Sequence, residues 1–241
     1  MIREWKAPST VNTSLCVFKQ IANQLWLAGR ITDRTNTIIF RIRNRRGSRI
    51  AHGRMLSFDE VHYLFKKLDK SKTFFDIRNA AMLAVMATCA LRRSEVSALR
   101  NENVHLGDNP FLKIIGKGNK ERIVPIPRET VRRLAEWRQI RGVDAGWFFV
   151  QMDNSENLND RPLSSQRIYE ICKSLIAKTG MQQWSPHDLR RTSASNMIDR
   201  GVDINTVKDF LGHASISTTQ LYDKRNDDRL KRAAEAVNWG I

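Results

Sequence analysis

Four short stretches of this 241-residue sequence carry charged or reactive side chains where a plain helical core would not place them. The residue types are arginine, lysine, histidine and tyrosine, which together suit chemistry at a phosphate. Guanidinium and ammonium groups bind phosphate oxygens. A phenol, whose pKa is about 10, needs nearby positive charge or a base before it becomes a nucleophile. The same cations could stabilise a five-coordinate phosphorus transition state without a metal ion.

The first two stretches place cations near a helix start and at a hairpin tip. Arg92 and Glu95 are three residues apart, so the carboxylate can hold the guanidinium while part of its fork stays available to an oxyanion. Lys117 stands in the glycine-rich turn 116–119, from which it could deliver an ammonium to a phosphate or to a leaving oxygen. A surface ion pair and a solvated turn lysine are the ordinary alternatives.

The other two stretches lie in the last third of the chain. His187 and Arg190 are three residues apart near a helix start, where the backbone dipoles favour a phosphate. The alternative is that they are polar residues at a helix end without a functional role. His213 follows the helix-stopping Gly212, and its segment ends on Tyr222. Because a tyrosine is commonly a core residue, Tyr222 alone does not indicate a nucleophile, and the hypothesis depends on the cations and histidines upstream of it.

Together and in this order, the four stretches resemble the tyrosine recombinases, also called phage integrases. The hairpin stretch is most similar to the Xer and integron-type members, and the resemblance runs from about residue 9 to the end of the chain. It implies a mainly α fold with a small antiparallel β-sheet, and site-specific DNA recombination by integration, excision or resolution. The matching stretches are residues 90–99, 116–126, 187–192 and 211–222.

The resemblance implies a role for the residues that would touch the scissile phosphate. Tyr222 would be the nucleophile, forming a 3′-phosphotyrosine link and a free 5′-hydroxyl. Arg92 and Arg190 would bind the non-bridging oxygens, and Lys117 would protonate the leaving 5′-oxygen. Religation with a hydroxyl from another strand would reverse the step, so no cofactor and no ATP are implied.

Three further implications follow from the resemblance. His187 would act as an acid or base near the nucleophile, His213 would hydrogen-bond the phosphate, and Glu95 would orient the helix of the first arginine. The enzyme would assemble on DNA as a dimer at each site and as a tetramer at synapsis. Two departures from the family pattern, Ala90 in place of a frequent glycine and Arg191 in place of a frequent histidine, look tolerable.

Charge and composition fit a polyanionic partner. The net charge is +16 with a sequence pI of about 10.3, which predicts nucleic acid as the first candidate; a solvated basic surface is the alternative. The resemblance implies that this partner is double-stranded DNA. No apolar run reaches the roughly 20 residues of a membrane span, and no signal-peptide core is evident. Cys16, Cys89 and Cys172 are too widely spaced to indicate a disulfide framework or a zinc site. We expect a cytoplasmic protein without a metal.

Apolar spacing predicts mostly helices as the elements that position these stretches. Strands are expected at 111–115 and 122–126, a short buried segment at 147–150 and a polar loop at 153–161. Helices are expected at 9–30, 57–68, 75–89, 92–100, 129–141, 162–178, 186–198, 204–211 and 227–237.

The chain is predicted to have two parts. Residues 1–50 would be the remnant of an N-terminal DNA-clamping domain with a basic linker, and residues 51–241 the catalytic domain with its C-terminal helix. Residues 31–54 lack clean periodicity and are interpreted as that linker, whose arginines could follow a phosphate backbone. Because family members carry a longer clamp, either the chain is truncated or the recombinase is naturally minimal. The candidate DNA contacts are Arg41, Arg43, Arg45, Arg46, Lys120 and Arg191.

Two other functions stay open from the sequence. A type IB topoisomerase-like enzyme would nick and close DNA without exchanging strands between sites, as a weak clamp would allow. A non-catalytic DNA-binding derivative of the fold would bind without cutting, although the intact set of reactive residues argues against it.

Overall fold

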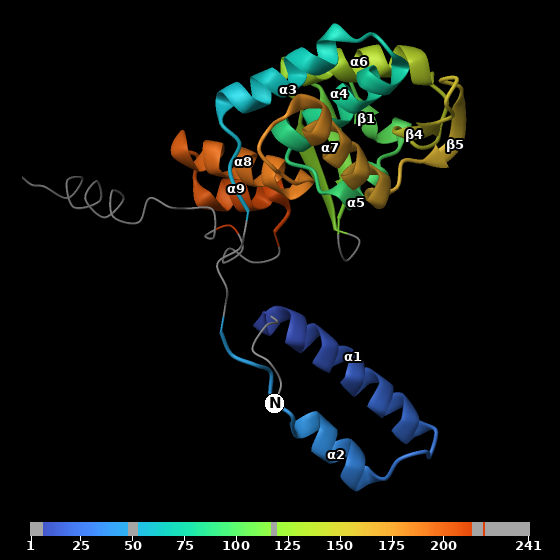
Figure 1. Cartoon of the computed structure of the whole chain (residues 1–241), viewed down its shortest axis with the longest axis vertical. Helices are drawn as coiled ribbons and strands as arrows, with labels where there is room; N and C mark the ends of the chain where they lie inside the picture. Colours follow the sequence, from blue (N-terminus) through green and yellow to red (C-terminus); the bar gives the residue numbers. More distant parts are fainter. Residues whose placement is uncertain (1–6, 48–52, 117–119, 214–218, 220–241) are drawn as a thin grey trace, which may run out of the picture. The chain divides into compact units, whose positions relative to one another are not determined.

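The computed structural model describes residues 7–47, 53–116 and 120–213 together with Thr219 (Figure 1). Its contacts divide the chain into two compact units, residues 1–52 and 53–241. The predicted final helix at 227–237 lies outside the described residues. Among the helices that the structure describes, none combines the length and the apolar composition needed to cross a lipid bilayer.

The first unit contains two helices, α1 (Pro8–Leu27) and α2 (Asp33–Arg41). The helix predicted at 9–30 is confirmed, and its end is set by Gly29, whose φ of +68° suits a residue without a Cβ. The backbone N–H of Gly29 donates to the carbonyl of Trp26 over 2.9 Å, which satisfies one of the last carbonyls of the helix.

Helix α2 corrects the prediction that residues 31–54 form a linker throughout. The Thr32 hydroxyl accepts a hydrogen bond from the backbone N–H of Thr35, and Asp33 lies in the first turn, where the helix dipole favours an anion. Trp26 donates its indole N–H to Asp33 over 2.5 Å and so ties the start of α2 to the end of α1. These local caps outweigh the irregular mixture of apolar and basic residues that suggested a linker.

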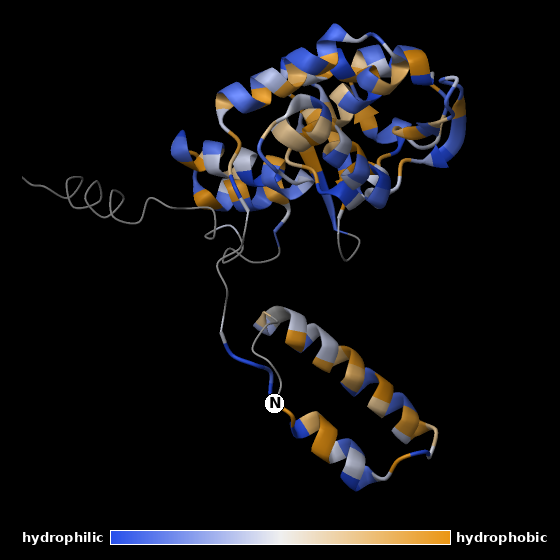
Figure 2. Cartoon of the chain, in the orientation of Figure 1, coloured by the Kyte–Doolittle hydropathy of each residue, from blue (hydrophilic) through white to orange (hydrophobic). Residues whose placement is uncertain are grey.

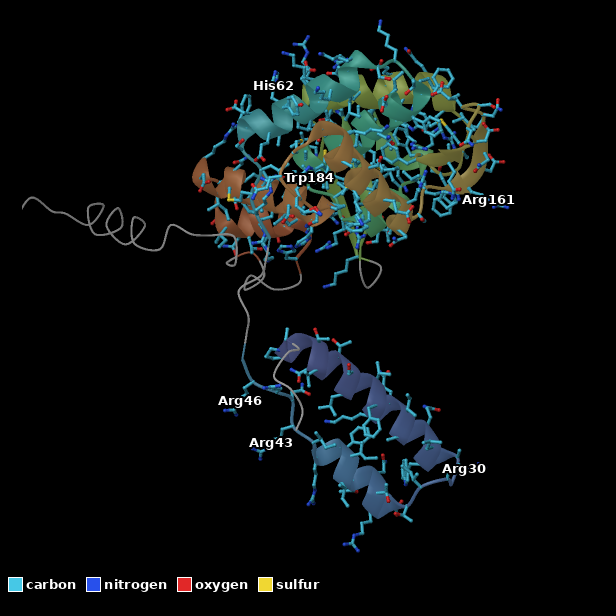
Figure 3. The ribbon with its side chains drawn as sticks, in the orientation of Figure 1. Arg30, Arg43, Arg46, His62, Arg161 and Trp184 are labelled. Carbon is cyan, nitrogen blue, oxygen red and sulfur yellow. The ribbon has the colours of Figure 1, made fainter. Side chains whose placement is uncertain are left out.

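The basic stretch after α2 is attached to α1 through its backbone. Asn12 pairs with the backbone of Arg45 in both directions, over 2.7 and 3.0 Å, and Lys19 donates to the carbonyl of Ile42 over 2.8 Å. The side chains of Arg43 and Arg46 point away from the two helices (Figure 3). Residues 42–47 therefore form an ordered segment along α1, and their arginines are exposed to solvent.

The two-helix unit presents a broad apolar surface. Among its described residues only Ala22 is buried, whereas large apolar side chains of both helices are exposed, as the orange stripe of α1 shows (Figure 2). An apolar surface of this kind is typical of an interaction site. The exposed residues are Val17, Phe18, Ile21, Leu25, Trp26, Leu27, Ile38, Phe40 and Ile42.

The second unit is mainly helical, as predicted. Most of α4 is buried, and it packs against α3, α6 and α8. Ser57 and Glu60 form the predicted capping box at the start of α3. The helix predicted at 92–100 is shorter than expected, because the chain leaves α5 at Ala98 and enters a 3-10 turn. The helices are α3 (Phe58–Lys70), α4 (Phe74–Thr88), α5 (Arg93–Ser97), α6 (Arg128–Arg141), α7 (Ser165–Thr179), α8 (Pro186–Asp199) and α9 (Ile204–Leu211).

A three-stranded antiparallel sheet carries the predicted hairpin. Strands β2 (Phe111–Ile115) and β3 (Glu121–Pro125) pair in a register that joins Leu112 to Val124, and the short β1 (Val104–His105) adds to the edge of β2. The hairpin is confirmed up to the backbone pair between Gly116 N–H and the Lys120 carbonyl, 2.7 Å apart.

The polar loop predicted at 153–161 is wrong in part, because β4 (Val150–Met152) and β5 (Leu158–Pro162) form a second antiparallel hairpin. Asp153 closes its turn by accepting from the backbone N–H groups of Ser155 and Asn157, over 2.8 and 3.0 Å. Strand β5 is almost entirely exposed, so it carries none of the apolar alternation that identifies a strand from sequence.

Ala90 adopts a conformation that few residues with a Cβ accept. It lies between α4 and α5 with a φ of +52° and is fully buried beside Ala194, Ile198 and Leu211. Its carbonyl accepts a hydrogen bond from the guanidinium of Arg190. The turn at Ala90 therefore helps to hold one of the candidate phosphate-binding arginines.

Substitutions at Ala90 test this strained turn. Ala90→Val should lower the free energy of unfolding by about 2–3 kcal/mol, because a β-branched side chain is strained at positive φ and overpacks the site. Ala90→Gly is the matched control and should change it by less than about 1 kcal/mol, since the lost methyl burial offsets the relieved strain. Urea unfolding measures both, and an Ala90→Val protein as stable as the parent would contradict the turn geometry.

Candidate active site

The carboxylate of Glu95 is the centre of the candidate site. Glu95 lies in the first turn of α5, and its side chain is only 4% exposed. Its two oxygens accept from the backbone N–H and the guanidinium of Arg92, each over 2.8 Å. Burial alone would raise the pKa of Glu95, but hydrogen bonds from Arg122 and from the Arg92 backbone hold it below its ordinary value. The carboxylate is therefore ionised at neutral pH.

Arg122, on β3, is the main residue that sequence reasoning missed. Its guanidinium donates a hydrogen bond to each oxygen of Glu95, over 2.9 and 3.0 Å. The guanidinium of Arg190 lies 3.9 Å from the same carboxylate. The signal for Arg122 was the strand alternation, because Arg122 and the buried Val124 point to the same, inward side of β3. An arginine at an inward strand position needs a buried carboxylate, and Glu95 supplies it.

The end of α9 binds the same three arginines through the main chain. The last carbonyls of a helix have no partner within it and lie at the negative end of the helix dipole, so they attract cations. Three consecutive carbonyls each accept from a different arginine, which ties α9 to the segments that carry these side chains. Arg122 donates to Phe210 over 3.2 Å, Arg190 to Leu211, and Arg92 to Gly212 over 3.0 Å.

Gly212 is required at this point for two reasons. Its φ of +61° is the left-handed conformation of a helix C-cap. A Cβ on Gly212 would lie 2.9 Å from the Arg122 guanidinium. Only a residue without a side chain lets Arg122 lie directly on the backbone that leads to His213.

His213 lies directly beside this cluster and is 8% exposed. Its Nδ1 is 2.9 Å from the hydroxyl oxygen of Thr219, a buried residue whose part in the site sequence reasoning did not identify. Burial, followed by the charges of Arg190 and Arg92, lowers the pKa of His213 to about 4. The imidazole is therefore neutral near pH 7.

His187, in the first turn of α8, is the second histidine of the site. It is exposed, and the protein around it still desolvates the ring. Desolvation, followed by the charges of Arg190 and Arg191, lowers the pKa of His187 below its ordinary value. A neutral imidazole can accept a proton, which is what a base beside a phenol must do.

Two open pockets meet at Arg92. A pocket of about 480 Å³ is lined by Arg92, His187 and Arg190, and a groove of about 1150 Å³ is lined by Arg92, Lys120 and His213 among others. The arrangement can therefore surround an anion with cations and neutral imidazoles. Within the part of the chain that the structure describes, no three His, Cys, Asp or Glu side chains are placed to hold a metal ion.

The sequence-predicted residues fall into three groups. The structure brings six of them to the two pockets, describes others elsewhere in their own units, and does not describe Lys117 and Tyr222. Arg191 packs its guanidinium against Gly53, where an added Cβ would lie 2.7 Å away. Arg41, Arg43, Arg45 and Arg46 belong to the first unit and are exposed. The six that line the pockets are Arg92, Glu95, Lys120, His187, Arg190 and His213.

The neutral state of His213 predicts how stability depends on pH. Its folded pKa of about 4 lies below its ordinary value of 6.5, so the unfolded chain binds the proton more tightly. This contribution to stability is present above pH 6.5 and is lost as the pH falls toward 4. The free energy of unfolding should therefore fall less steeply over this window in His213→Gln than in the parent.

Imidazole ¹⁵N resonances follow the titration directly, and urea unfolding at each pH gives the stability. His62→Gln is the control, because His62 is an exposed residue of α3 outside the site. A His213 ring that titrates near pH 6.5 in the folded protein would refute the described burial.

The chain matches the model of the phage integrase family over residues 54–229. It is 33% identical to the tyrosine recombinase XerA of Pyrococcus furiosus, over 76% of this chain and 61% of that protein. It is 35% identical to the tyrosine recombinase XerD of Oceanobacillus iheyensis, over 73% of this chain and 59% of that protein. The chain thus spans about three fifths of the length of these curated relatives.

Solved structures show the same fold. The crystal structure of XerA recombinase aligns with a TM-score of 0.61 at 24% identity, over 92% of this chain and 82% of that one. The XerH site-specific recombinase, bound to its difH substrate after cleavage, aligns with a TM-score of 0.58 at 23% identity, over 75% of this chain and 52% of that one. The fold predicted from sequence is confirmed, and the chain belongs to the phage integrase family.

Proposed function

We propose that this chain is a site-specific recombinase that cuts and rejoins double-stranded DNA through a 3′-phosphotyrosine intermediate. One observation carries the proposal: Arg92, Arg190, His187 and His213 meet around two adjoining pockets, with the ionised Glu95 behind them. The net charge of +16 supports a polyanionic substrate. The relatives reported above are recombinases, which favours strand exchange over nicking and closing alone.

In the proposed reaction, the Tyr222 phenol attacks the scissile phosphorus. A bond forms between the phenol oxygen and phosphorus, and the bond from phosphorus to the 5′-oxygen breaks. His187 accepts the phenol proton and Lys117 gives a proton to the leaving oxygen. Religation runs the same steps in reverse with a 5′-hydroxyl from another strand. The roles of Lys117 and Tyr222 are supported by the family resemblance alone, because both residues lie outside the described part of the chain.

The arginines are placed before substrate arrives. Arg92 is 34% exposed and Arg190 is 1% exposed, so Arg92 meets the phosphate from solvent while Arg190 acts from inside the protein. Both guanidinium groups already bind carbonyls at the end of α9. Exchanging a neutral carbonyl for a phosphate oxygen adds the attraction of a negatively charged acceptor to a hydrogen bond whose donor is already charged, and this attraction strengthens as negative charge gathers in the transition state.

His213 is proposed to donate to a non-bridging phosphate oxygen. A neutral imidazole has one N–H, and the hydrogen bond at its other nitrogen decides which. We propose that Thr219 donates its hydroxyl proton to Nδ1, 2.9 Å away, so that the ring proton is held at Nε2 and can be donated to substrate.

DNA is the proposed partner, and it would be bound by more than the active site. Structures of XerH carry difH DNA, and we propose that this chain likewise binds duplex DNA as a dimer at each site and as a tetramer at synapsis. Residues 1–50 are proposed to belong to the DNA-clamping domain, and residues 51–241 to form the catalytic domain. Such a DNA enzyme is expected in the cytoplasm. The proposed phosphate contacts are Arg41, Arg43, Arg45, Arg46, Lys120 and Arg191.

A covalent trapping experiment tests the proposed function. A duplex is first selected for binding from a randomised pool and then nicked, so that the cleaved strand diffuses away and the adduct accumulates. The parent should form a protein–DNA adduct, and Tyr222→Phe should form none, because phenylalanine has no oxygen to attack phosphorus. Denaturing gel electrophoresis with mass spectrometry of the adduct peptide reads the result.

Tyr63→Phe is the matched control, because Tyr63 donates its hydroxyl to the Thr179 carbonyl on the second unit's surface and lies outside the pockets. An adduct from Tyr222→Phe would refute the nucleophile. DNA binding by the parent without any adduct would favour the non-catalytic alternative. Relaxation of a supercoiled plasmid that lacks the selected site would favour the topoisomerase-like alternative.

The tautomer assignment gives a second prediction. Thr219→Val should slow adduct formation by about 3- to 10-fold, the effect of one lost hydrogen bond. Thr219→Ser keeps the hydroxyl and should stay close to the parent. Single-turnover rates at saturating DNA measure both. A valine variant as fast as the parent would refute the role of the hydroxyl, and a slow serine variant beside it would show that the methyl packing matters instead.

A further inference from the structure

We propose that Arg122 is a positioning residue that neutralises Glu95, so that Arg92 and Arg190 stay available to the phosphate. The inference rests on the proposed function and names a residue for the same site. Arg122 lines the 1150 Å³ groove beside Glu95 but does not line the described part of the 480 Å³ pocket. It acts through the residues that do.

The first argument is geometric. Arg122 makes the one bidentate side-chain contact to Glu95 among the described residues, over 2.9 and 3.0 Å. Arg92 reaches a single oxygen with its side chain, and Arg190 remains 3.9 Å away. A guanidinium fork matched to both carboxylate oxygens is the strongest arrangement for such a pair. Arg122 is therefore the principal counterion of Glu95.

The second argument is electrostatic. Glu95 is buried, and a buried carboxylate must be paired because its desolvation is costly. Without Arg122, its nearest described cations are Arg92 and Arg190. Glu95 would then draw both guanidinium groups toward itself and cancel part of the positive charge in the pocket. Arg122 prevents this competition between a carboxylate and a phosphate for the same two arginines.

The third argument is mechanical. Arg122 belongs to β3, binds α5 through Glu95, and donates from Nε to the Phe210 carbonyl at the end of α9. Its guanidinium also lies against Gly212. When Arg92 and Arg190 leave their α9 carbonyls for a phosphate, Arg122 keeps its own. The chain leading to His213 would therefore stay in register during the reaction.

A double-mutant cycle separates neutralisation from simple bracing. Arg122→Met removes the charge and keeps much of the aliphatic bulk, and it should lower the single-turnover adduct rate at saturating DNA by about 10- to 100-fold. Adding Glu95→Gln removes the unpaired carboxylate, so the double variant should react faster than Arg122→Met alone. Arg122→Lys keeps the charge without the fork and should lie between the parent and Arg122→Met.

Arg133→Met is the matched control for lost stability. Arg133 donates two hydrogen bonds to the carboxylate of Asp69, over 2.6 and 2.8 Å, and its side chain is 12% exposed, against 13% for Arg122. This ion pair joins α6 to α3 outside the pockets. The adduct rate of Arg133→Met should equal that of the parent at a temperature where both are folded. An Arg122→Met rate like that of Arg133→Met, or a double variant no faster than Arg122→Met, would overturn the inference.

Binding of inorganic phosphate to the chain without DNA, measured by calorimetry, gives a readout that does not need cleavage. Arg122→Met should weaken phosphate binding, and adding Glu95→Gln should restore it. Unchanged phosphate affinity in Arg122→Met would overturn the inference even if the parent forms the adduct. A parent that binds phosphate and forms no adduct would refute only the proposed function, whereas a parent that does neither would refute both.

Discussion

The site depends on one buried negative charge. Glu95 is almost inaccessible to solvent, and it remains ionised because Arg122, Arg92 and Arg190 surround it. A buried carboxylate without such partners would protonate or destabilise the fold. The helices and the hairpin must therefore bring Arg122 and Arg190, from distant parts of the sequence, to the side chain that the neighbouring Arg92 already contacts. This requirement explains why α5, β3, α8 and α9 meet where they do.

The excess of positive charge has a second effect on the histidines. His213 and His187 are both held neutral, since desolvation and neighbouring guanidinium groups oppose a further positive charge. The arginines and the two neutral imidazoles therefore have different roles at a phosphate. The arginines remain positively charged at every pH at which the protein is folded, whereas a neutral imidazole can donate or accept a proton.

The sequence predicted most of the helices and the central hairpin, because amphipathic spacing, caps and glycine turns are local signals. It also identified Arg92, Glu95, His187, Arg190 and His213, which the structure brings together. It missed α2, a helix of only 9 residues none of which is buried, and β5, which lies on the surface without an apolar face. It missed Arg122 and Thr219 for a different reason. The alternation of β3 indicates that Arg122 points inward, but the partners of Arg122 and Thr219 come from the fold and are not marked by any local pattern.

The three arginine contacts at the end of α9 involve carbonyls, which every amino acid carries. Phe210 and Leu211 could therefore be exchanged for other residues that keep the helix and its packing, and the same hydrogen bonds would form. Gly212 has no such freedom, because Arg122 occupies the place of its side chain. The amino acids at positions 210 and 211 can thus change while the hydrogen bonds from the arginines to the backbone carbonyls remain. The contacts that hold the three arginines to α9 therefore depend on the backbone conformation, and Gly212 is the position where this dependence restricts the amino acid.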